Sequence, residues 1–422
     1  MTADAKAGPL GRRAKAAGMD GLDAEPVNRP RVRPAAGHGL GHRPLPPLSL
    51  YVHVPWCVRK CPYCDFNSHQ ADGELPEQAY LAALQADLEH ALPLIWGRQV
   101  ISIFIGGGTP SLLSAQAIDT MLASFRACLN VLPDAEITLE ANPGTAEAGR
   151  FLDYAASGVN RISLGIQSFN DEALRALGRI HDSRQARAAI EMAQKAVERV
   201  NLDVMYALPG QSLQACQEDL QAAMAFQTGH LSLYHLTLEP NTVFAKFPPP
   251  LPDDDLAAAM HEHIIEATTA AGWEQYEVSA YARPGQRSLH NQNYWTFGDY
   301  LGLGPGAHGK LSFHDRIIRQ ARHRMPESWM SRCMQRDGSQ IVEERALAPQ
   351  ELPFEFMLNA LRLKEGVEAG LFSAHTGLPV TAIFPTLKRL EERNLLSLTG
   401  GRLRTTELGW RYLNDVLEDF LQ

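Results

Sequence analysis

The stretch LSLYVHVPWCVRKCPYCDF, residues 48–66, joins a run of apolar and β-branched residues to three closely spaced cysteines. Its first seven residues predict a buried β-strand. Cys57, Cys61 and Cys64 then follow within eight positions, separated by three residues and by two. The stretch therefore predicts a strand that ends in a loop carrying three thiols.

Further runs of the same kind recur along the chain, separated by segments of helical period. The expected strands after the first are residues 100–106, 136–142, 161–167, 200–206 and 230–236. Segments with helical spacing lie at 76–92, 114–129 and 183–200. Strands that alternate with helices predict βα units and a parallel sheet. Six units predict an α/β fold, a partial (β/α)6 barrel, with an open doubly wound sheet as the alternative.

Polar and glycine-rich motifs stand at the downstream ends of these strands. They read GGGTP (106–110), EANPG (140–144), GIQSFN (165–170) and DVMYALPGQ (203–211). In α/β barrels the active site is built at the carboxyl ends of the strands. The motifs and the cysteine loop are therefore expected to meet at one rim of the barrel.

Three thiolates can hold three corners of a four-iron, four-sulfur cluster and leave one iron open to an exchangeable ligand. A zinc site is the alternative, but it needs a fourth ligand, for which His53 or His69 is available. The other cysteines, Cys128, Cys216 and Cys333, are each isolated in a helix-like context. They are expected to be small buried apolar residues.

A CxxxCxYC motif after a first strand, in a chain of six βα units, is similar to the radical S-adenosylmethionine (SAM) superfamily. Together with GGGTP, EANP, GIQSFNDEALRALGRIH, DVMYALPGQ and HNQNYW, it resembles the branch that contains oxygen-independent coproporphyrinogen III oxidase and a paralogous group of haem chaperones. The resemblance covers residues 48–422. It implies a [4Fe–4S] cluster whose open iron binds SAM, and an electron donor for the cluster.

The resemblance also assigns site residues. Cys57, Cys61 and Cys64 match the cluster ligands. The positions that match contacts to SAM are Tyr51, Tyr63, Phe66, Gly107, Gly108, Thr109, Glu140, Gln167, Arg179 and Asp203. The plainer alternatives are a βα turn for the glycines, a capping or rim acid for Glu140, structural hydrogen bonds for Gln167 and Asp203, and a solvated ion pair for Arg179.

Two positions in the cysteine loop depart from the oxidase. The oxidase typically has a further cysteine where this chain has Phe66, and Phe where this chain has Tyr63. The oxidase also has an N-terminal arm that closes its site, and residues 1–47 do not resemble that arm. These departures favour a haem chaperone.

The HNQNYW motif, residues 290–295, is typical of the haem chaperone group. His290 is a candidate iron ligand, and Asn291, Tyr294 and Trp295 complete the haem candidates. The alternative is a helix start at which His and Asn act as caps and the aromatic rings are in the core.

Other histidines carry less weight as haem candidates. His308, in GPGAHG, is a second candidate for the iron. His261 and His263 are expected on a helix surface.

Net charge is −9, and the first 46 residues carry a net +4, which leaves −13 on the rest. So acidic a body argues against nucleic acid as a partner. No apolar run is long enough for a membrane span. The clustered cysteines, without a signal peptide, favour a reducing cytoplasm.

Four segments are expected. Residues 1–47 form a disordered leader, for which an organelle transit peptide is the alternative, and residues 48–245 form the partial barrel. Residues 246–345 connect it to a winged-helix-like module at 346–422, which ends in a hairpin on Gly400–Gly401 and an amphipathic helix. Basic residues in the module alternate with acidic ones, which favours packing or partner contact over DNA.

The sequence therefore predicts a haem chaperone that passes haem to acceptor proteins, membrane-bound acceptors included. The alternatives are oxygen-independent coproporphyrinogen III oxidase and another radical enzyme with the same cofactors.

Overall fold

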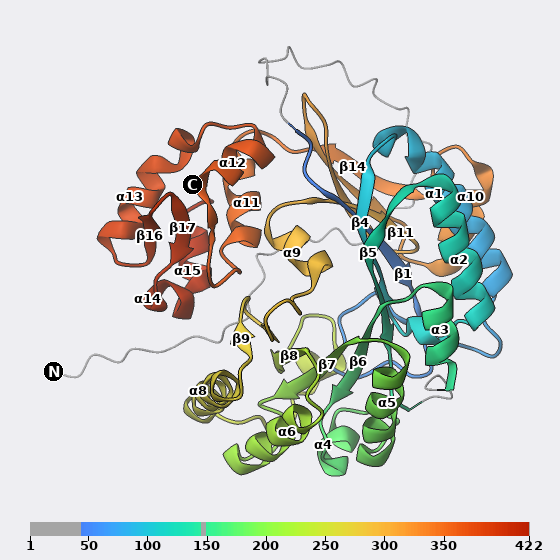
Figure 1. Cartoon of the computed structure of the whole chain (residues 1–422), viewed down its shortest axis with the longest axis horizontal. Coiled ribbons are helices and arrows are strands. Elements are labelled where there is room, and N and C mark those ends of the chain that lie inside the picture. Colours follow the sequence, from blue (N-terminus) through green and yellow to red (C-terminus); the bar gives the residue numbers. More distant parts are fainter. Residues whose placement is uncertain (1–43, 145–148, 422) are drawn as a thin grey trace.

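The structure is a computed structural model that describes residues 44–144 and 149–421. Parallel strands form the centre of a curved sheet (Figure 1). In sheet order they are β11 (Asp299–Leu303), β1 (Leu48–Val54), β4 (Gln99–Gly107), β5 (Asn130–Ala141), β6 (Arg161–Gln167), β7 (Arg199–Tyr206) and β8 (His230–His235). The order from β1 to β8 follows the chain in one direction, whereas a doubly wound sheet reverses its order. The predicted α/β barrel of six βα units is confirmed.

Helices cover the outer, convex side of this sheet (Figure 1). They are α1 (Glu77–Ile95), α2 (Ala115–Cys128), α3 (Phe151–Ser157), α4 (Asp171–Ala176), α5 (Ser183–Ala196), α6 (Leu213–Ala225) and α8 (Asp254–Ala270). The short α7 (Val243–Lys246) instead packs against the cysteine loop, through Phe244 and Tyr63. Several begin at a side-chain cap, as α5 does with a capping box between Asp182 and Gln185. Cys216 and Cys333 are buried as predicted, and Cys128 is half-buried.

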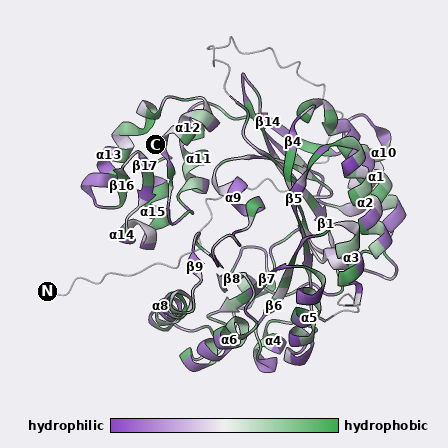
Figure 2. Cartoon of the chain, in the orientation of Figure 1, coloured by the Kyte–Doolittle hydropathy of each residue, from purple (hydrophilic) through white to green (hydrophobic). Residues whose placement is uncertain are grey.

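The strands alternate in character because successive side chains point to opposite faces. On β1, Leu50 and Val52 pack toward the helices, whereas Tyr51 contacts Phe104 and His53 on the inner face. Figure 2 shows the apolar colouring concentrated along central strands such as β4. The inner face is the polar one, which leaves the barrel interior available for chemistry.

Residues 246–345 contribute further strands that the sequence did not predict. They lengthen the same sheet at both edges, so that it has twelve strands among the described residues. These are β9 (Glu274–Gln275) and β10 (Ala280–Ala282) beside β8, and β12 (His308–Ser312), β13 (Ile317–Arg322) and β14 (Ile341–Ala346) beyond β11. Helix α9 (Leu289–Trp295) lies on the concave side, and α10 (Pro326–Gln335) packs on α1 through Trp329 and Tyr80.

The C-terminal module has its own small sheet and apolar core, at the left of Figure 1. Its elements are α11 (Leu352–Ala360), β15 (Val367–Glu368), α12 (Ala369–Thr376), α13 (Phe384–Glu392), β16 (Leu396–Thr399), β17 (Arg402–Thr405), α14 (Glu407–Arg411) and α15 (Leu413–Glu418). The hairpin on Gly400–Gly401 forms as predicted. The prediction of a single amphipathic helix at the end of the chain was wrong. The helix is divided into α14 and α15, because the chain leaves helical geometry at Tyr412, with φ −113° and ψ 41°.

The predicted leader lies mostly outside the described residues. Its last residues are bound to the barrel, because the Pro46 carbonyl accepts from Arg98 at 2.5 Å and the Pro47 carbonyl accepts from the Asp299 amide at 2.9 Å. Within the described ranges, no helix is long and apolar enough to cross a membrane.

Glu136 on β5 holds the start of α9. Its carboxylate accepts the backbone N–H groups of Leu289 and His290, each at 3.0 Å, and pairs with Arg199 at 2.8 Å. Burial alone raises the pKa of Glu136, but Arg161, Arg199 and the two backbone donors outweigh burial and keep it below its ordinary value. A buried anion thus caps the helix inside the barrel.

Replacing Glu136 by alanine is expected to destabilise the protein by about 3 kcal/mol, because Arg199 and two amides lose a buried partner. Since the folded pKa is lowered, the contribution of Glu136 is present above its ordinary pKa and is lost as pH falls through the lowered one. Urea unfolding of Glu136→Ala and parent at neutral and acidic pH measures both effects. The exposed Glu198→Ala is the control, and equal midpoints for the two variants at neutral pH contradict the role of Glu136.

Candidate functional site

The cysteine loop is anchored at both ends by backbone hydrogen bonds. A short parallel pair, β2 (Trp56–Cys57) with β3 (His69–Gln70), closes it. Within it, the Cys64 amide donates to the Cys61 carbonyl at 3.2 Å, and Lys60 Nζ donates to the Phe66 carbonyl at 3.1 Å. Backbone hydrogen bonds and the Lys60 side chain together order the loop.

The glycine turn after β4 lies directly beneath this loop. The Gly108 amide donates to the Val54 carbonyl and the Thr109 amide to the Trp56 carbonyl, both at 2.7 Å. A Cβ on Gly108 would stand 2.5 Å from the Trp56 oxygen, and Gly107 has a φ of +118°. Glycine is required at both positions, for close approach and for left-handed backbone.

The cysteine loop brings Cys57, Cys61 and Cys64 together, and the Arg179 guanidinium lies beside them. Burial is the main cause that raises the pKa of Cys57 and of Cys64, and the neighbouring Cys61 raises each further. Arg179 Nη1 donates to Cys61 Sγ at 3.6 Å. Arg179 thus places one guanidinium beside the three thiols. Among the described residues, no three His, Cys, Asp or Glu side chains stand at the spacing of a single-ion site.

Asn142, from the EANP motif, is a site residue that sequence reasoning did not single out. Its amide donates to Thr109 Oγ1 at 2.8 Å, and its Oδ1 accepts from Arg179. Arg179 also donates to the Gly165 carbonyl at 2.8 Å, near Gln167, whose φ is +68°. Arg179 is thus a fixed part of the rim rather than a solvated surface residue.

Two half-buried carboxyl groups, Glu140 and Asp203, face the barrel interior below the rim. Glu140 accepts the Gly107 amide at 3.0 Å, and burial followed by the nearby Asp203 raises its pKa to about 8. Asp203 accepts from Ser163 at 3.0 Å and from Asn201 at 2.9 Å, and burial raises its pKa as well. A cation placed between them would be favoured electrostatically.

His53 is fully engaged within the protein. The Tyr51 hydroxyl donates to His53 Nδ1 at 2.9 Å, and His53 Nε2 donates to the Asn67 carbonyl at 2.8 Å. His69 contacts the side chain of Asn67 at 3.3 Å. The ring nitrogens of His53 are therefore committed, which argues against its use as a fourth ligand to zinc.

The two aromatic residues of the cysteine loop differ in environment. Tyr63 packs against Phe244 of α7 with ring centroids 6.3 Å apart. Phe66 is 55% exposed and stands on the loop surface. The position at which the resemblance implies a further cysteine in the oxidase is thus an open apolar ring.

The HNQNYW motif forms α9, and its cap is Ser288, which accepts the Asn291 amide at 3.3 Å. His290 is only 2% exposed, Nδ1 is hydrogen-bonded to Ser102 at 3.0 Å, and burial lowers its pKa to about 3. His290 Nε2 has no hydrogen-bond partner in the described part of the chain. The histidine is neutral and enclosed.

The aromatic residues of the motif link two regions. Tyr294 stacks on Tyr300 at 4.2 Å and contacts the ring of His290 at 5.1 Å. Trp295 lies under the Arg362 guanidinium at 4.3 Å. The structure places His308 apart from these, in a cavity over β11–β14.

His261 departs from the surface position predicted for it. It is half-buried on α8 and stacks on Tyr206 with centroids 6.1 Å apart, and burial lowers its pKa. His263 is half-buried too. The helical period placed both residues on α8 but did not show which side other elements cover.

Known proteins resemble the chain along nearly its whole length. Residues 51–223 match the radical SAM superfamily, and residues 347–412 match the HemN C-terminal domain. The chain is 48% identical over 379 residues to the "Heme chaperone HemW" of Escherichia coli (strain K12), covering 89% of this chain and 99% of that protein. The chain belongs to the HemW family of radical SAM proteins.

The HemW family has more distant relatives with the same architecture. The chain is 36% identical over 408 residues to the "Radical S-adenosyl methionine domain-containing protein 1, mitochondrial" of Bos taurus, covering 93% of this chain and 92% of that protein. The solved coproporphyrinogen III oxidase (HemN) from Escherichia coli aligns with a TM-score of 0.77 at 23% identity, covering 90% of this chain and 92% of that chain. This likeness shows the fold.

Membership of the radical SAM superfamily implies a [4Fe–4S] cluster and SAM. The residues present fit both groups. Three thiols share one loop beside a guanidinium, and the glycine turn below them exposes backbone where a Cβ would clash. The half-buried carboxyl groups of Glu140 and Asp203 face the same interior.

Gly108→Ala is expected to displace the cysteine loop, because its Cβ meets backbone atoms that cannot rotate away. We expect at least about a threefold loss of iron and sulfide after anaerobic reconstitution, since ligand geometry sets cluster stability. Iron, sulfide and visible absorption are measured against Gly370→Ala, a helical glycine with open space around it. Equal cluster content in both variants contradicts the steric role of Gly108.

Proposed function

We propose that this chain binds haem and passes it to acceptor proteins, and that it carries a [4Fe–4S] cluster and SAM. The observation that carries the proposal is the 48% identity to a haem chaperone over 99% of that protein's length. The acceptor proteins, an electron donor for the cluster and a cytoplasmic location belong to the same proposal, as does contact with membrane-bound acceptors.

In the proposal, Cys57, Cys61 and Cys64 hold three irons and leave the fourth for SAM. The cluster supplies one electron and SAM supplies a radical precursor when both are bound. The protein groups proposed to receive SAM are Tyr51, Tyr63, Phe66, Gly107, Gly108, Thr109, Glu140, Gln167, Arg179 and Asp203. Gly107 and Gly108 allow the ligand to approach the backbone, while Glu140 and Asp203 attract its positive charge.

The chaperone is favoured over the oxidase by the cysteine loop. The oxidase must remove two propionate carboxyl groups from a porphyrinogen, and its loop typically has a further cysteine where this chain has Phe66. Phe66 has no side-chain proton to transfer and no metal-binding atom. An exposed ring at this point suits contact with an apolar surface.

Anaerobically reconstituted protein is expected to bind one haem per chain and to leave coproporphyrinogen III unchanged. Haem titration followed by the Soret band measures the first, and chromatography of porphyrin products measures the second. The oxidase of Escherichia coli serves as the positive control for turnover. Formation of protoporphyrinogen by this chain would falsify the chaperone proposal in favour of the oxidase.

Glu140 is expected to make SAM binding depend on pH. With a pKa near 8 the group is mostly protonated at neutral pH, and a bound cation favours its ionised form. Affinity should therefore rise as pH increases through about 8, by about tenfold between full protonation and full ionisation.

Calorimetry with SAM at several pH values, on parent and Glu140→Gln, measures this dependence. SAM titrates identically in both experiments, so only the difference between the two profiles reports Glu140. Parallel profiles would remove Glu140 from the cation site.

A further inference from the structure

One row of side chains crosses the inner face of the central sheet. In order from β1 to β7, its members are Tyr51, Phe104, Thr138, Arg161 and Arg199. Paired residues of neighbouring parallel strands point to the same face of a sheet, so the other four project into the barrel interior together with Tyr51. The row therefore begins with two aromatic rings and ends with two guanidinium groups.

Among the described residues, Arg161 is a buried cation without an ion-pair partner. It is only 2% exposed, and within the described ranges its guanidinium makes no hydrogen bond. Arg199, next to it, pairs with Glu136 at 2.8 Å and donates to the Arg287 carbonyl at 2.7 Å. A buried guanidinium without an anion is unfavourable, since it has lost water and gained no partner. Arg161 is thus suited to an anionic ligand.

Arg161 interacts electrostatically with Glu136, Glu140 and Asp203, but each of these is engaged elsewhere. Glu136 pairs with Arg199 and accepts two backbone amides of α9. Glu140 accepts an amide of the glycine turn, and Asp203 accepts from two polar side chains. Burial raises the pKa of Glu140 and of Asp203, which favours the neutral carboxyl. Arg161 therefore has no carboxylate of its own in the described part of the chain.

Two further polar atoms near Arg161 have no hydrogen-bond partner among the described residues. Thr138 Oγ1 lies one strand away, in register with Arg161, and His290 Nε2 belongs to a ring that contacts Phe104 at 5.0 Å. Thr138 and His290 are both at most 2% exposed. Phe104 and Arg161 are two strand spacings apart, about 10 Å. A ligand that reaches His290 beside Phe104 can therefore place an acidic edge at Arg161.

The inner face also has the apolar surface that a porphyrin needs. Tyr51, Phe104 and Tyr294 are half-buried aromatic residues, and Tyr234, near the end of β8, is 42% exposed. Aromatic ring faces pack well on a flat apolar ligand, and a guanidinium binds carboxylates. The barrel interior thus combines the two kinds of contact that haem requires.

We infer that Arg161 binds a propionate carboxylate of haem inside the barrel, and that the Thr138 hydroxyl donates to the same group. The inference rests on the proposed haem-binding function and names the side chains that recognise the acidic edge of the cargo. SAM is less suited to Arg161, because its sulfonium and amino groups are positive and favour the acidic pair Glu140 and Asp203.

Haem and its dimethyl ester, which lacks the propionate charges, are the probes for Arg161. Arg161→Gln should weaken haem at least about tenfold, since it removes a charge-assisted hydrogen bond in a buried site. The dimethyl ester should bind this variant within about twofold of parent, because it has no carboxylate to lose. Soret titrations of anaerobically reconstituted protein measure both affinities.

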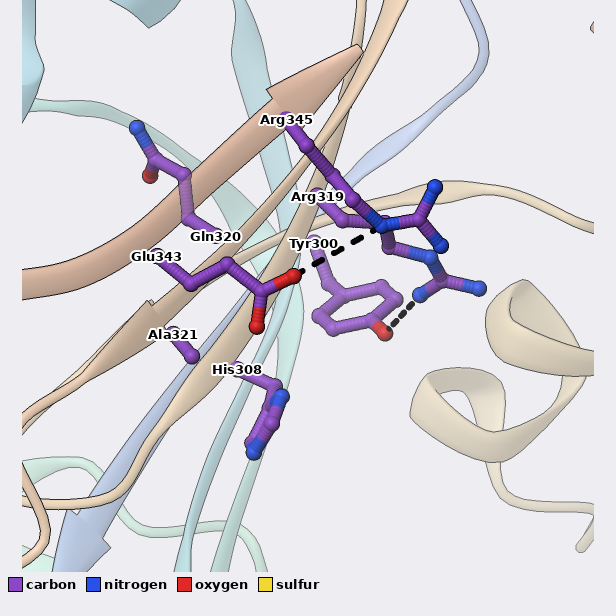
Figure 3. Close-up of a pocket in the computed structure, with 7 residues that line it drawn as sticks. All are labelled: Tyr300, His308, Arg319, Gln320, Ala321, Glu343 and Arg345. Carbon is purple, nitrogen blue, oxygen red and sulfur yellow. Dashed lines mark hydrogen bonds and ion pairs between the residues drawn. The ribbon is translucent and has the colours of Figure 1, made fainter. Parts of the chain in front are cut away.

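Two further variants test the same contact if Arg161→Gln does not fold. Arg161→Lys keeps the charge and should weaken haem only about threefold, through loss of the planar fork. Thr138→Val removes the hydroxyl at nearly constant shape, and should weaken haem about threefold while leaving the ester unchanged. The matched control is Arg345→Gln in the cavity over β11–β14, where the guanidinium already contacts Glu343 at 3.6 Å (Figure 3) and Glu351 at 2.8 Å. This control should match parent with both probes.

Calorimetry with SAM separates the two ligands. Arg161→Gln should bind SAM within about threefold of parent, since SAM is attracted by the acidic pair instead. If the variant loses affinity for SAM but keeps that for haem, or if haem and the ester weaken equally, the inference is overturned while haem binding by the chain stands. If parent binds neither haem nor the ester, the proposed function is lost and this inference with it.

Discussion

The parallel pairing of β1 with β4 is the constraint on which the cofactor rim depends. Its register sets Val54 opposite Gly107, so that the glycine turn passes directly under the cysteine loop. The contact is between backbones: amides of the turn donate to carbonyls of the loop, and no Cβ fits at Gly108. Main-chain hydrogen bonds therefore fix the height of the cysteine loop above the glycine turn, and Lys60 and Arg179 add side-chain contacts to it.

Below that rim, acidic and basic side chains in the barrel interior shift one another's pKa values. Glu136 is stabilised by Arg161, Arg199 and the amino end of α9, whereas Glu140 lacks an equally close cation and has a raised pKa. Unpaired buried charge is unfavourable, so Glu140 favours any arriving positive group. The interior thus combines a structural anion paired with Arg199 and an acidic group, beside the glycine turn, whose raised pKa favours its neutral form.

Helix α9 divides the concave side of the sheet. His290 and Tyr294 of α9, with Phe104 of β4, form a row of rings between Tyr51 and Tyr300. This row lies between the inner face of β1 and the cavity over β11–β14. The fold is shared with the oxidase at a TM-score of 0.77. A shared fold does not decide between oxidase and chaperone, since function depends on the site rather than on the fold.

Sequence alone determined the six βα units, the thiol loop and the glycine turn, because strand and helix periods, glycine and cysteine spacing are local properties of the chain. It did not predict β11 beside β1, the bridging role of Asn142 or the cavity over β11–β14, since each depends on residues far apart in sequence. The motif HNQNYW shows the limit most clearly. Its histidine and aromatic residues are of the types that bind haem. Only the tertiary structure shows that Ser102 and Phe104 enclose His290, whereas His308 faces an open cavity. The local sequence could not show this, because the burial of a side chain depends on neighbours that are distant in sequence.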